Sequence, residues 1–127
     1  KRADVSSLDE VCKVCKGADA VISAFNPGWN NPDIYKETIE VYLTIIDGVK
    51  KAGVNRFLMV GGAGSLFIAP GIRLVDSGEV PEKILPGVRA LSDFYLDFLR
   101  LTGFSSCRRQ IWLLEYVQAD IAWGKMR

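Results

Sequence analysis

The sequence contains no histidine, and this absence excludes several kinds of site. Without histidine the chain cannot build a Ser-His or Cys-His catalytic pair or a His-ligated zinc site from its own residues. The sequence also has no excess of one charge sign: the net charge is +1, and no cluster of lysine and arginine stands out. No basic face therefore predicts a nucleic acid or an anionic membrane as partner. No hydrophobic run approaches the ~20 residues of a membrane span, and the N-terminal KRADVSSLDE lacks the pattern of a signal peptide. The remaining composition, 49% hydrophobic in 127 residues, is that of one globular domain or a piece of one.

Cysteine is scarce, with residues only at Cys12, Cys15 and Cys107. The first two form a C-x-x-C, a pattern found in redox dithiols and in zinc sites. Zinc would need a second pair of ligands, which the sequence does not offer. A redox dithiol normally sits at a helix N-terminus, where the helix dipole lowers the thiol pKa, whereas these cysteines come after the helix start SSLDE. We therefore expect both to pack as small apolar residues. The lack of a disulfide framework favours a reducing cytoplasm.

Two phosphate-binding patterns are also missing. A dinucleotide loop needs G-x-G-x-x-G directly before a helix. The stretch NRFLMVGGAGSLFIAPG has glycines at 61, 62 and 64 but no third glycine at the required spacing, and SLFIAPG does not begin a helix. No G-x-x-x-x-G-K-[ST] occurs. We interpret GGAGS as the end of a buried strand, whose small residues let a flat group approach the backbone.

The sequence does contain a regular alternation of helix and strand patterns. Short continuous apolar runs are typical of strands buried on both faces, and apolar residues at a spacing of three to four are typical of helices. Alternation with short connections predicts an α/β fold with a parallel sheet and right-handed crossovers. The expected elements are a helix at 6–17 with Ser6 or Ser7 as N-cap, a strand at 18–25, a helix at 33–52, a strand at 54–61, an irregular loop at 70–86 and a helix at 87–99.

In open α/β sheets, ligands bind beyond the carboxyl ends of the strands. Two loops occupy such positions here, SAFNPGW (23–29) and GGAGS (61–65), and both are candidate sites. Trp29 and Tyr35 follow the first of these strands; they either cover a flat ligand or pack against the neighbouring helix.

Three stretches carry a resemblance to a known family: KGADAVISAF, TIEVYLTIIDGVKKAGVNRFLMVGGAGSL and PGVRALSDFYLDFL. Over residues 1–99 the chain resembles the atypical short-chain dehydrogenase/reductase proteins of the NAD(P)-binding epimerase/dehydratase-like and NADH-flavin-reductase-like types. The resemblance implies a Rossmann-type three-layer parallel sheet, truncated at both ends. Residues 1–100 would be the central part of the NAD(P)-binding domain, with the glycine-rich phosphate loop upstream of residue 1. The first residue is not Met, which agrees with a fragment.

The resemblance also implies which residues meet the cofactor, NAD or NADP. The ends of three successive strands would border the adenine (4–5), the adenosine and nicotinamide ribose (22–25) and the nicotinamide (60–65). Asp4 is alternatively a surface or helix-capping carboxylate, and Arg89 either contacts a phosphate or substrate or is a solvated side chain. No metal ligand is expected. The expected cofactor-binding residues are Asp4, Val5, Ser23, Ala24, Phe25, Val60, Gly61, Gly62 and Arg89.

The catalytic pattern departs from the family. Typical members use a serine and a Tyr-x-x-x-Lys, in which the lysine lowers the tyrosine pKa. Ser65 stands near the serine position and is the catalytic candidate; its alternative role is to satisfy a loop amide. Leu85 and Arg89 stand where the tyrosine and lysine would be. Two hypotheses follow for the complete protein: an NAD(P)H-dependent reductase or epimerase-like enzyme acting on a small flat acceptor such as a quinone or flavin, and a non-catalytic dinucleotide-sensing regulator. We expect the fragment itself to be inactive.

The resemblance stops near residue 100. Relatives continue with a strand like DWVFFSPA and then PGVRTGRYRLGKD, whereas residues 101–127 differ. A shifted reading frame can be formed by joining the third base of each codon to the first two bases of the next codon. In this frame the codons of residues 115–122 can encode Gly-Val-Arg-Thr-Gly-Arg-Tyr-Arg, which is the relatives' motif. We hypothesise a single-base frame error near Arg100, so that 101–127 is a divergent tail and the sixth strand is missing. By periodicity alone, the apolar residues of this tail would form a helix at Ile111, Trp112, Leu113 and Leu114.

Overall fold

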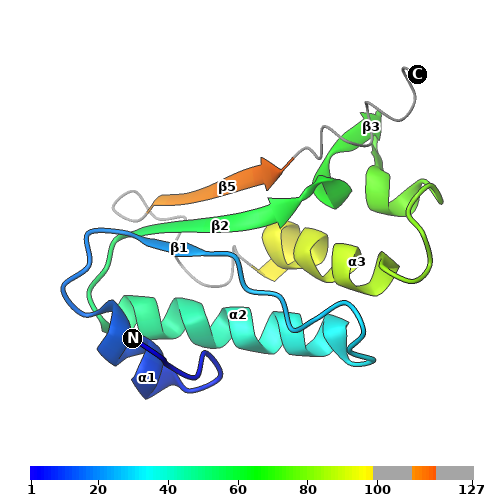
Figure 1. The fold of residues 1–127 in the computed structure, drawn as a ribbon. Helices are drawn as coiled ribbons and strands as arrows, with labels where there is room; N and C mark the ends of the chain where they lie inside the picture. Colours follow the sequence, from blue (N-terminus) through cyan, green and yellow to red (C-terminus); the bar gives the residue numbers. More distant parts are fainter. Residues whose placement is uncertain (99–109, 117–127) are drawn as a thin grey trace, which may run out of the picture.

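Two apolar runs separated by a long amphipathic helix form neighbouring strands of a parallel sheet. In the computed structural model, which describes residues 1–98 and 110–116, these strands are β1 (Val21–Ser23) and β2 (Arg56–Gly62). They pair with Val21 opposite Phe57 and Ser23 opposite Met59. Helix α2 (Ile34–Lys51) connects them (Figure 1). The strand–helix–strand unit predicted from the sequence is confirmed.

The core lies between α2 and the sheet. Apolar residues recur along α2 at helical spacing, so one face of this helix is buried against alternate residues of β2. Tyr42 sits at the centre with no exposed surface, and its ring lies 5.1 Å from that of Phe94 and 6.0 Å from that of Phe25. Burial raises the pKa of the Tyr42 hydroxyl. The other buried hydrophobic residues of this core are Val11, Cys15, Ile39, Val41, Ile45, Ile46, Val49, Val54, Phe57 and Met59.

Helix α1 (Leu8–Cys15) packs on α2. It begins after Ser7, one of the two predicted N-cap positions, although the Ser7 side chain makes no capping hydrogen bond. Close approach depends on Gly48, because a Cβ there would lie 2.6 Å from Val11 Cγ1. Cys15 is buried, and this burial raises the pKa of its thiol. Cys15 therefore packs as an apolar residue, as expected.

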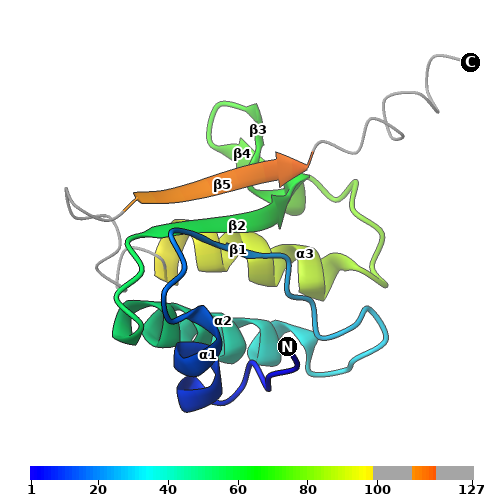
Figure 2. The same cartoon turned by 60° about the vertical axis from the view of Figure 1, so that its left-hand side comes forward.

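All three α-helices of the described chain lie on one face of the sheet (Figures 1 and 2). The expectation that both apolar runs are strands buried on both faces is wrong for β1. This strand has only three residues, and Ile22 on it is 68% exposed, because no described helix covers the other face. Ala24 and Phe25 follow β1 instead of belonging to it.

The segment between β2 and the next helix is more regular than predicted. A short 3-10 helix η1 (Ala63–Ser65) is followed by an antiparallel hairpin of β3 (Phe67–Ala69) and β4 (Ile72–Arg73), and then by η2 (Leu74–Asp76). The expected irregular loop at 70–86 is thus wrong over β4 and η2. Gly71 at the hairpin turn has a φ of +76°, a conformation that glycine adopts readily.

Helix α3 (Leu85–Asp93) begins two residues before the predicted start, with Pro86 in its first turn, where a missing N–H costs nothing. It continues as a π-helical turn, η3 (Phe94–Phe98), which places Phe94 under Tyr42 in the core. The rest of the predicted helix, to Leu99, lies outside the described residues, as does Cys107.

Part of the tail forms a third strand, β5 (Gln110–Tyr116), parallel to β2 with Arg56 opposite Gln110 and Gly62 opposite Tyr116. The order of the sheet is β1-β2-β5. The helix expected at 111–114 is therefore wrong, and a strand lies beside β2, where the sixth strand was expected to be missing. A short apolar run fits a helix or a strand equally by periodicity, and the backbone of β2 offers it hydrogen-bond partners. Residues 101–109 and 117–127 of the predicted tail lie outside the described residues.

Candidate functional site

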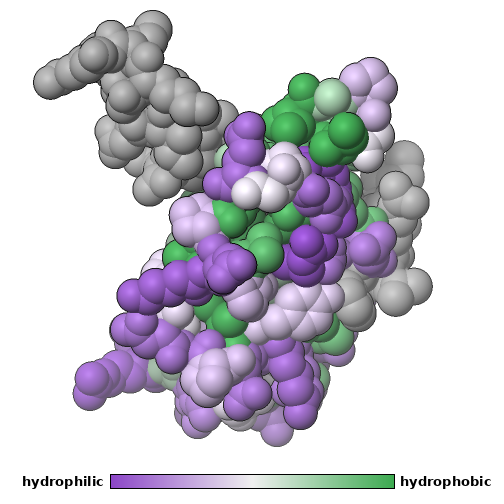
Figure 3. Space-filling model, turned by 90° about the vertical axis from the view of Figure 1, so that its right-hand side faces the viewer, coloured by the Kyte–Doolittle hydropathy of each residue, from purple (hydrophilic) through white to green (hydrophobic). Residues whose placement is uncertain are grey.

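A cavity of about 460 Å³ opens where β2 ends. Its floor is the glycine-rich turn Gly61–Gly64, and its walls come from α3, from Trp29 and from the segment that leads into α3. The face with the end of β2 and the start of α3, at the right of Figure 1, is turned toward the viewer in Figure 3. Hydrophobic side chains gather there between hydrophilic ones (Figure 3). The residues that line the walls are Trp29, Leu74, Glu79, Val80, Pro81, Ile84, Val88 and Leu91.

Two glycines of the floor, Gly62 and Gly64, differ in the space beside their Cα atoms. Gly62 is extended, with φ −135°, and a Cβ on it would meet no heavy atom within 4 Å. Gly64 is buried, and a Cβ on it would lie 2.5 Å from Val88 Cγ1 and 3.3 Å from the Val88 carbonyl oxygen. Gly64 therefore lets α3 pack closely on the turn, whereas Gly62 leaves open space where the strand ends.

Trp29 and Tyr35 turn out to have separate positions. The Trp29 ring lines the cavity and also lies against the start of α3, since a Cβ on Gly87 would be 2.8 Å from its Cζ3. Trp29 therefore packs against a helix, α3, and its covering of a flat ligand stays a prediction. Tyr35 is not among the lining residues; its hydroxyl donates a hydrogen bond to Asp93 Oδ2 at 3.0 Å.

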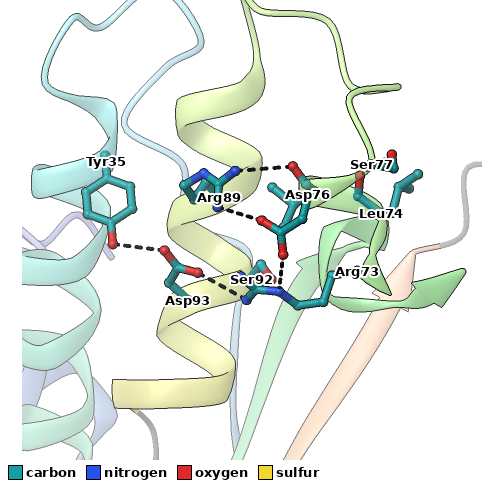
Figure 4. A network of polar contacts seen from close by, with 9 residues as sticks. Tyr35, Arg73, Leu74, Asp76, Ser77, Arg89, Ser92 and Asp93 are labelled. Carbon is teal, nitrogen blue, oxygen red and sulfur yellow. Dashed lines mark hydrogen bonds and ion pairs between the residues drawn. The ribbon is translucent and has the colours of Figure 1, made fainter. Parts of the chain in front are cut away.

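The segment 74–84, which we call the strap, forms one wall of the cavity and is anchored to α3 by ion pairs (Figure 4). Asp76 accepts from Arg73 Nε at 2.8 Å and from Arg89 Nη1 at 2.9 Å. Arg73 Nη1 also lies 3.2 Å from Asp93 Oδ1 and 3.2 Å from Ser92 Oγ. Arg89 Nη2 donates to the carbonyl oxygen of Val75 at 3.3 Å. The base of the strap is thus fixed at several points to the helix that forms the facing wall.

The pKa values of Asp76, Arg73 and Tyr35 are shifted in this network. Hydrogen bonds from Arg73, and then from Arg89, hold the pKa of Asp76 below its ordinary value. The hydrogen bond with Asp76 raises the pKa of Arg73. Burial, followed by the hydrogen bond to Asp93, raises the pKa of the Tyr35 hydroxyl. The shifts of Arg73 and Asp76 both favour the charged forms of these groups, which are paired.

The nicotinamide-side residues expected from the sequence lie at or beside the cavity. Gly61 and Gly62 line it, and Val60 precedes them in β2. Ser65, the catalytic candidate, is buried in η1 and is not among the lining residues. Arg89 is not among them either, because its guanidinium pairs with Asp76.

The residues expected to meet the adenosine half lie at two other places. Ser23 is buried at the end of β1, and Ala24 and Phe25 follow it; the Tyr42 hydroxyl donates to the Phe25 carbonyl oxygen at 3.3 Å. Asp4 is exposed, with Val5 beside it. Asp4 Oδ1 accepts from the Ser6 hydroxyl at 2.7 Å and the Ser6 amide at 2.9 Å, and these bonds lower the pKa of Asp4. Residues 1–4 and Glu10 line a shallow opening at this end of the chain.

Sequence reasoning missed most of the cavity walls. Ile84, the N-cap of α3, and Val88 and Leu91 within the helix are spaced to share one face, so their helical spacing was a usable signal. Glu79, Val80 and Pro81 of the strap gave no such signal, because their position depends on ion pairs between residues distant in the sequence.

Comparison with known proteins agrees with this geometry. Residues 2–84 match the NAD(P)H-binding family. The chain belongs to this family. The resemblance to atypical short-chain dehydrogenase/reductase proteins and the Rossmann-type α/β fold predicted from the sequence are thereby confirmed.

Three solved structures are similar to the chain. A proposed epimerase from Bacteroides thetaiotaomicron is 73% identical with a TM-score of 0.74, over 87% of this chain and 47% of that one. A proposed NADH-flavin reductase from Streptococcus pneumoniae is 30% identical with a TM-score of 0.60, over 88% of this chain and 50% of that one. A proposed exported protein from Burkholderia pseudomallei is 34% identical with a TM-score of 0.62, over 75% of this chain and 45% of that one. The chain thus spans about half the length of these relatives.

Among curated proteins, the uncharacterized protein YwnB of Bacillus subtilis is 38% identical over 73 residues, which are 56% of this chain and 33% of that protein. In the parts of the chain that the structure describes, no helix has both the length and the hydropathy of a membrane span. Nor do residues 1–98 and 110–116 gather three histidine, cysteine or acidic side chains into a group that could hold a metal ion.

Proposed function

We propose that the complete protein is an NAD(P)H-dependent oxidoreductase, in which the nicotinamide ring and a small flat acceptor such as a quinone or flavin meet in the cavity at the end of β2. The observation that carries this proposal is the open space beside Gly62, where a Cβ would meet no atom within 4 Å. A mostly apolar cavity of about 460 Å³ is within the usual size of small-molecule sites.

The residues present fit the nicotinamide half of the cofactor. Gly61 and Gly62 would offer a backbone surface without side chains to one face of the ring. Since β1 and β2 are parallel neighbours, residues 23–25 lie at the same edge of the sheet and would meet the ribose. Asp4 and Val5 would border the adenine. When bound, the nicotinamide supplies a hydride; Trp29 and the strap would exclude water from it.

Proton transfer by a serine, tyrosine or lysine has no support among the described lining residues. The sequence has Leu85 and Arg89 in place of a Tyr-x-x-x-Lys, and Ser65 is buried away from the lining. Hydride transfer to a quinone or flavin needs mainly the positioning of two flat rings. This argument favours a reductase over an epimerase-like activity.

The lack of a serine, tyrosine or lysine among the described lining residues also favours a second candidate, a non-catalytic regulator that senses dinucleotide binding. Such a lining agrees with a site that binds the cofactor and performs no chemistry. The two candidates predict the same cofactor site and differ in turnover.

The experiment is to incubate the complete protein with NADPH or NADH and a quinone or a flavin. We expect oxidation of the reduced cofactor that depends on the acceptor. Cofactor binding without turnover would support the regulator instead, and absence of cofactor binding would contradict both. Ser65→Ala is the control for side-chain chemistry: we expect less than a tenfold loss of rate, equivalent to about 1.4 kcal/mol.

A further inference from the structure

Over the described part of the cavity wall, the side-chain charge comes from one residue. Of the described residues that line it, Glu79 alone carries a charge, and the others are glycine, alanine, tryptophan, proline and aliphatic residues. No arginine or lysine is among these lining residues. An anionic group brought into the cavity would therefore meet a carboxylate without a compensating cation on the described wall.

The arginines nearest in the fold are already engaged. Arg89 is paired with Asp76 at 2.9 Å, and Arg73 is paired with Asp76 at 2.8 Å and with Asp93 at 3.2 Å. Turning either guanidinium toward a ligand would break ion pairs that anchor the strap. The network therefore holds the positive charge of this region outside the cavity lining.

Glu79 itself is held in place through its backbone. The Ser77 hydroxyl donates to the Leu74 carbonyl oxygen at 2.7 Å and accepts from the Glu79 amide at 3.2 Å. Gly78 between them has a φ of +80°, so the chain turns sharply here and brings Glu79 to the cavity wall. The anchored strap thus sets where the carboxylate can reach.

We propose that Glu79 selects the charge of the acceptor: the cavity takes flat, uncharged or cationic ring systems and rejects rings that carry a carboxylate or sulfonate. This inference rests on the proposed function and narrows its substrate class. No described lining residue carries a positive charge that would offset the repulsion between Glu79 and a ligand anion. Quinones and the neutral isoalloxazine ring satisfy this condition, whereas an acidic aromatic substrate does not.

The test measures the binding of three bicyclic aromatic probes to the chain by calorimetry: neutral naphthamide, anionic naphthoate, which has the same shape, and cationic N-methylquinolinium. We expect naphthoate to bind about tenfold more weakly than naphthamide, a difference of about 1.4 kcal/mol, and N-methylquinolinium to bind at least as tightly as naphthamide. In Glu79→Gln the affinities for naphthoate and naphthamide should become equal. Glu82→Gln, an exposed strap residue that does not line the cavity, is the matched control and should keep the selectivity.

A second measurement does not depend on a variant. Added salt screens exposed charges, so the preference for naphthamide over naphthoate should shrink as ionic strength rises. Equal binding of naphthamide and naphthoate, no binding of naphthamide, or unchanged selectivity in Glu79→Gln would each overturn the inference. These outcomes are separate from NAD(P)H turnover by the complete protein, which tests the proposed function on its own.

Discussion

At the scale of single residues, the site depends on where side chains are absent. Gly62 and Gly64 are separated only by Ala63, yet one borders open space and the other touches α3. Substitution of each should therefore give a different kind of loss. Gly62 should matter for ligand binding, and Gly64 for the stability of the fold.

We expect Gly62→Val in the complete protein to leave the thermal unfolding midpoint unchanged and to weaken NADPH binding at least tenfold. The backbone at Gly62 is extended, which valine accepts, and a Cβ there has no heavy atom within 4 Å apart from its chain neighbours, so the added side chain would enter the space proposed for the ligand. Calorimetric titration measures the affinity. A wild-type dissociation constant for this variant would contradict the placement of the nicotinamide beside Gly62.

Gly64→Ala should instead destabilise the chain by about 1–3 kcal/mol, because its Cβ would overlap Val88 Cγ1. Chemical denaturation measures this loss, with Gly62→Ala as the control that should be neutral. Val88→Ala removes the overlapping atom, so Gly64→Ala should cost less in that background than in the wild type. Additive losses in the double variant would show that Val88 is not the cause.

The residue scale also separates what the sequence could predict from what it could not. The glycine-rich strand end was identifiable, because an apolar run that breaks into glycines is a local signal. Glu79 was not, because an exposed glutamate in a polar segment looks like any solvated residue until its position on the cavity wall is known. Ser65 was chosen by its place in a motif, and only its burial shows that it lies apart from the lining.

At the scale of elements, charge pairs join the strap and the residue before it to α3. Asp76 is the shared acceptor of Arg73 and Arg89, so protonating it removes both partners at once. Its pKa is lowered in the folded chain. Such a group adds stability that is fully present above the unfolded pKa and is lost as the pH falls through the folded value.

Asp76→Asn should therefore lower stability at neutral pH and flatten its decline in acid, below about pH 3.9, the ordinary aspartate pKa. The free energy of unfolding measured by denaturant titration at several pH values checks this. Asp47→Asn, which changes an exposed carboxylate of α2, should leave the acid decline as in the wild type. An equally steep decline in Asp76→Asn would show that other carboxylates control it.

Sequence patterns predicted the elements unequally. The long helix α2 and the strand β2 were predicted almost to the residue, because their apolar spacing extends over many positions. The hairpin β3–β4 was missed, since two very short strands leave no periodicity. For β5, a run of four apolar residues fits a helix or a strand, and only pairing with β2 distinguishes them.

At the scale of the whole molecule, the chain covers about half the length of its relatives and contains no G-x-G-x-x-G. A dinucleotide gains much of its affinity from backbone amides at a helix N-terminus that meet the pyrophosphate. We therefore expect this chain alone to bind NADPH weakly or not at all in a calorimetric titration. Micromolar affinity for NADPH would contradict that expectation.

The tail poses a different question for the whole molecule. Pairing of β5 with β2 does not test the reading frame, because a short apolar run can pair with a strand whatever its origin. We retain the proposal that residues 101–127 result from a single-base frame error near Arg100. Sequencing the source DNA tests it: codons 101–127, read with the one-base shift, should spell the relatives' motif. Any other sequence in that frame would rule the proposal out.

The way in which the strap is attached bears on how the protein could diversify. Its anchors are Arg73 and Asp76 at one end of the segment and Arg89 and Asp93 on α3, and none of them lines the cavity. The strap residues that do line it include Glu79, Val80 and Pro81, which hold no core position. Mutations at these three positions can thus alter ligand preference without loosening the scaffold, so that new specificities can evolve here through small changes to an exposed surface segment.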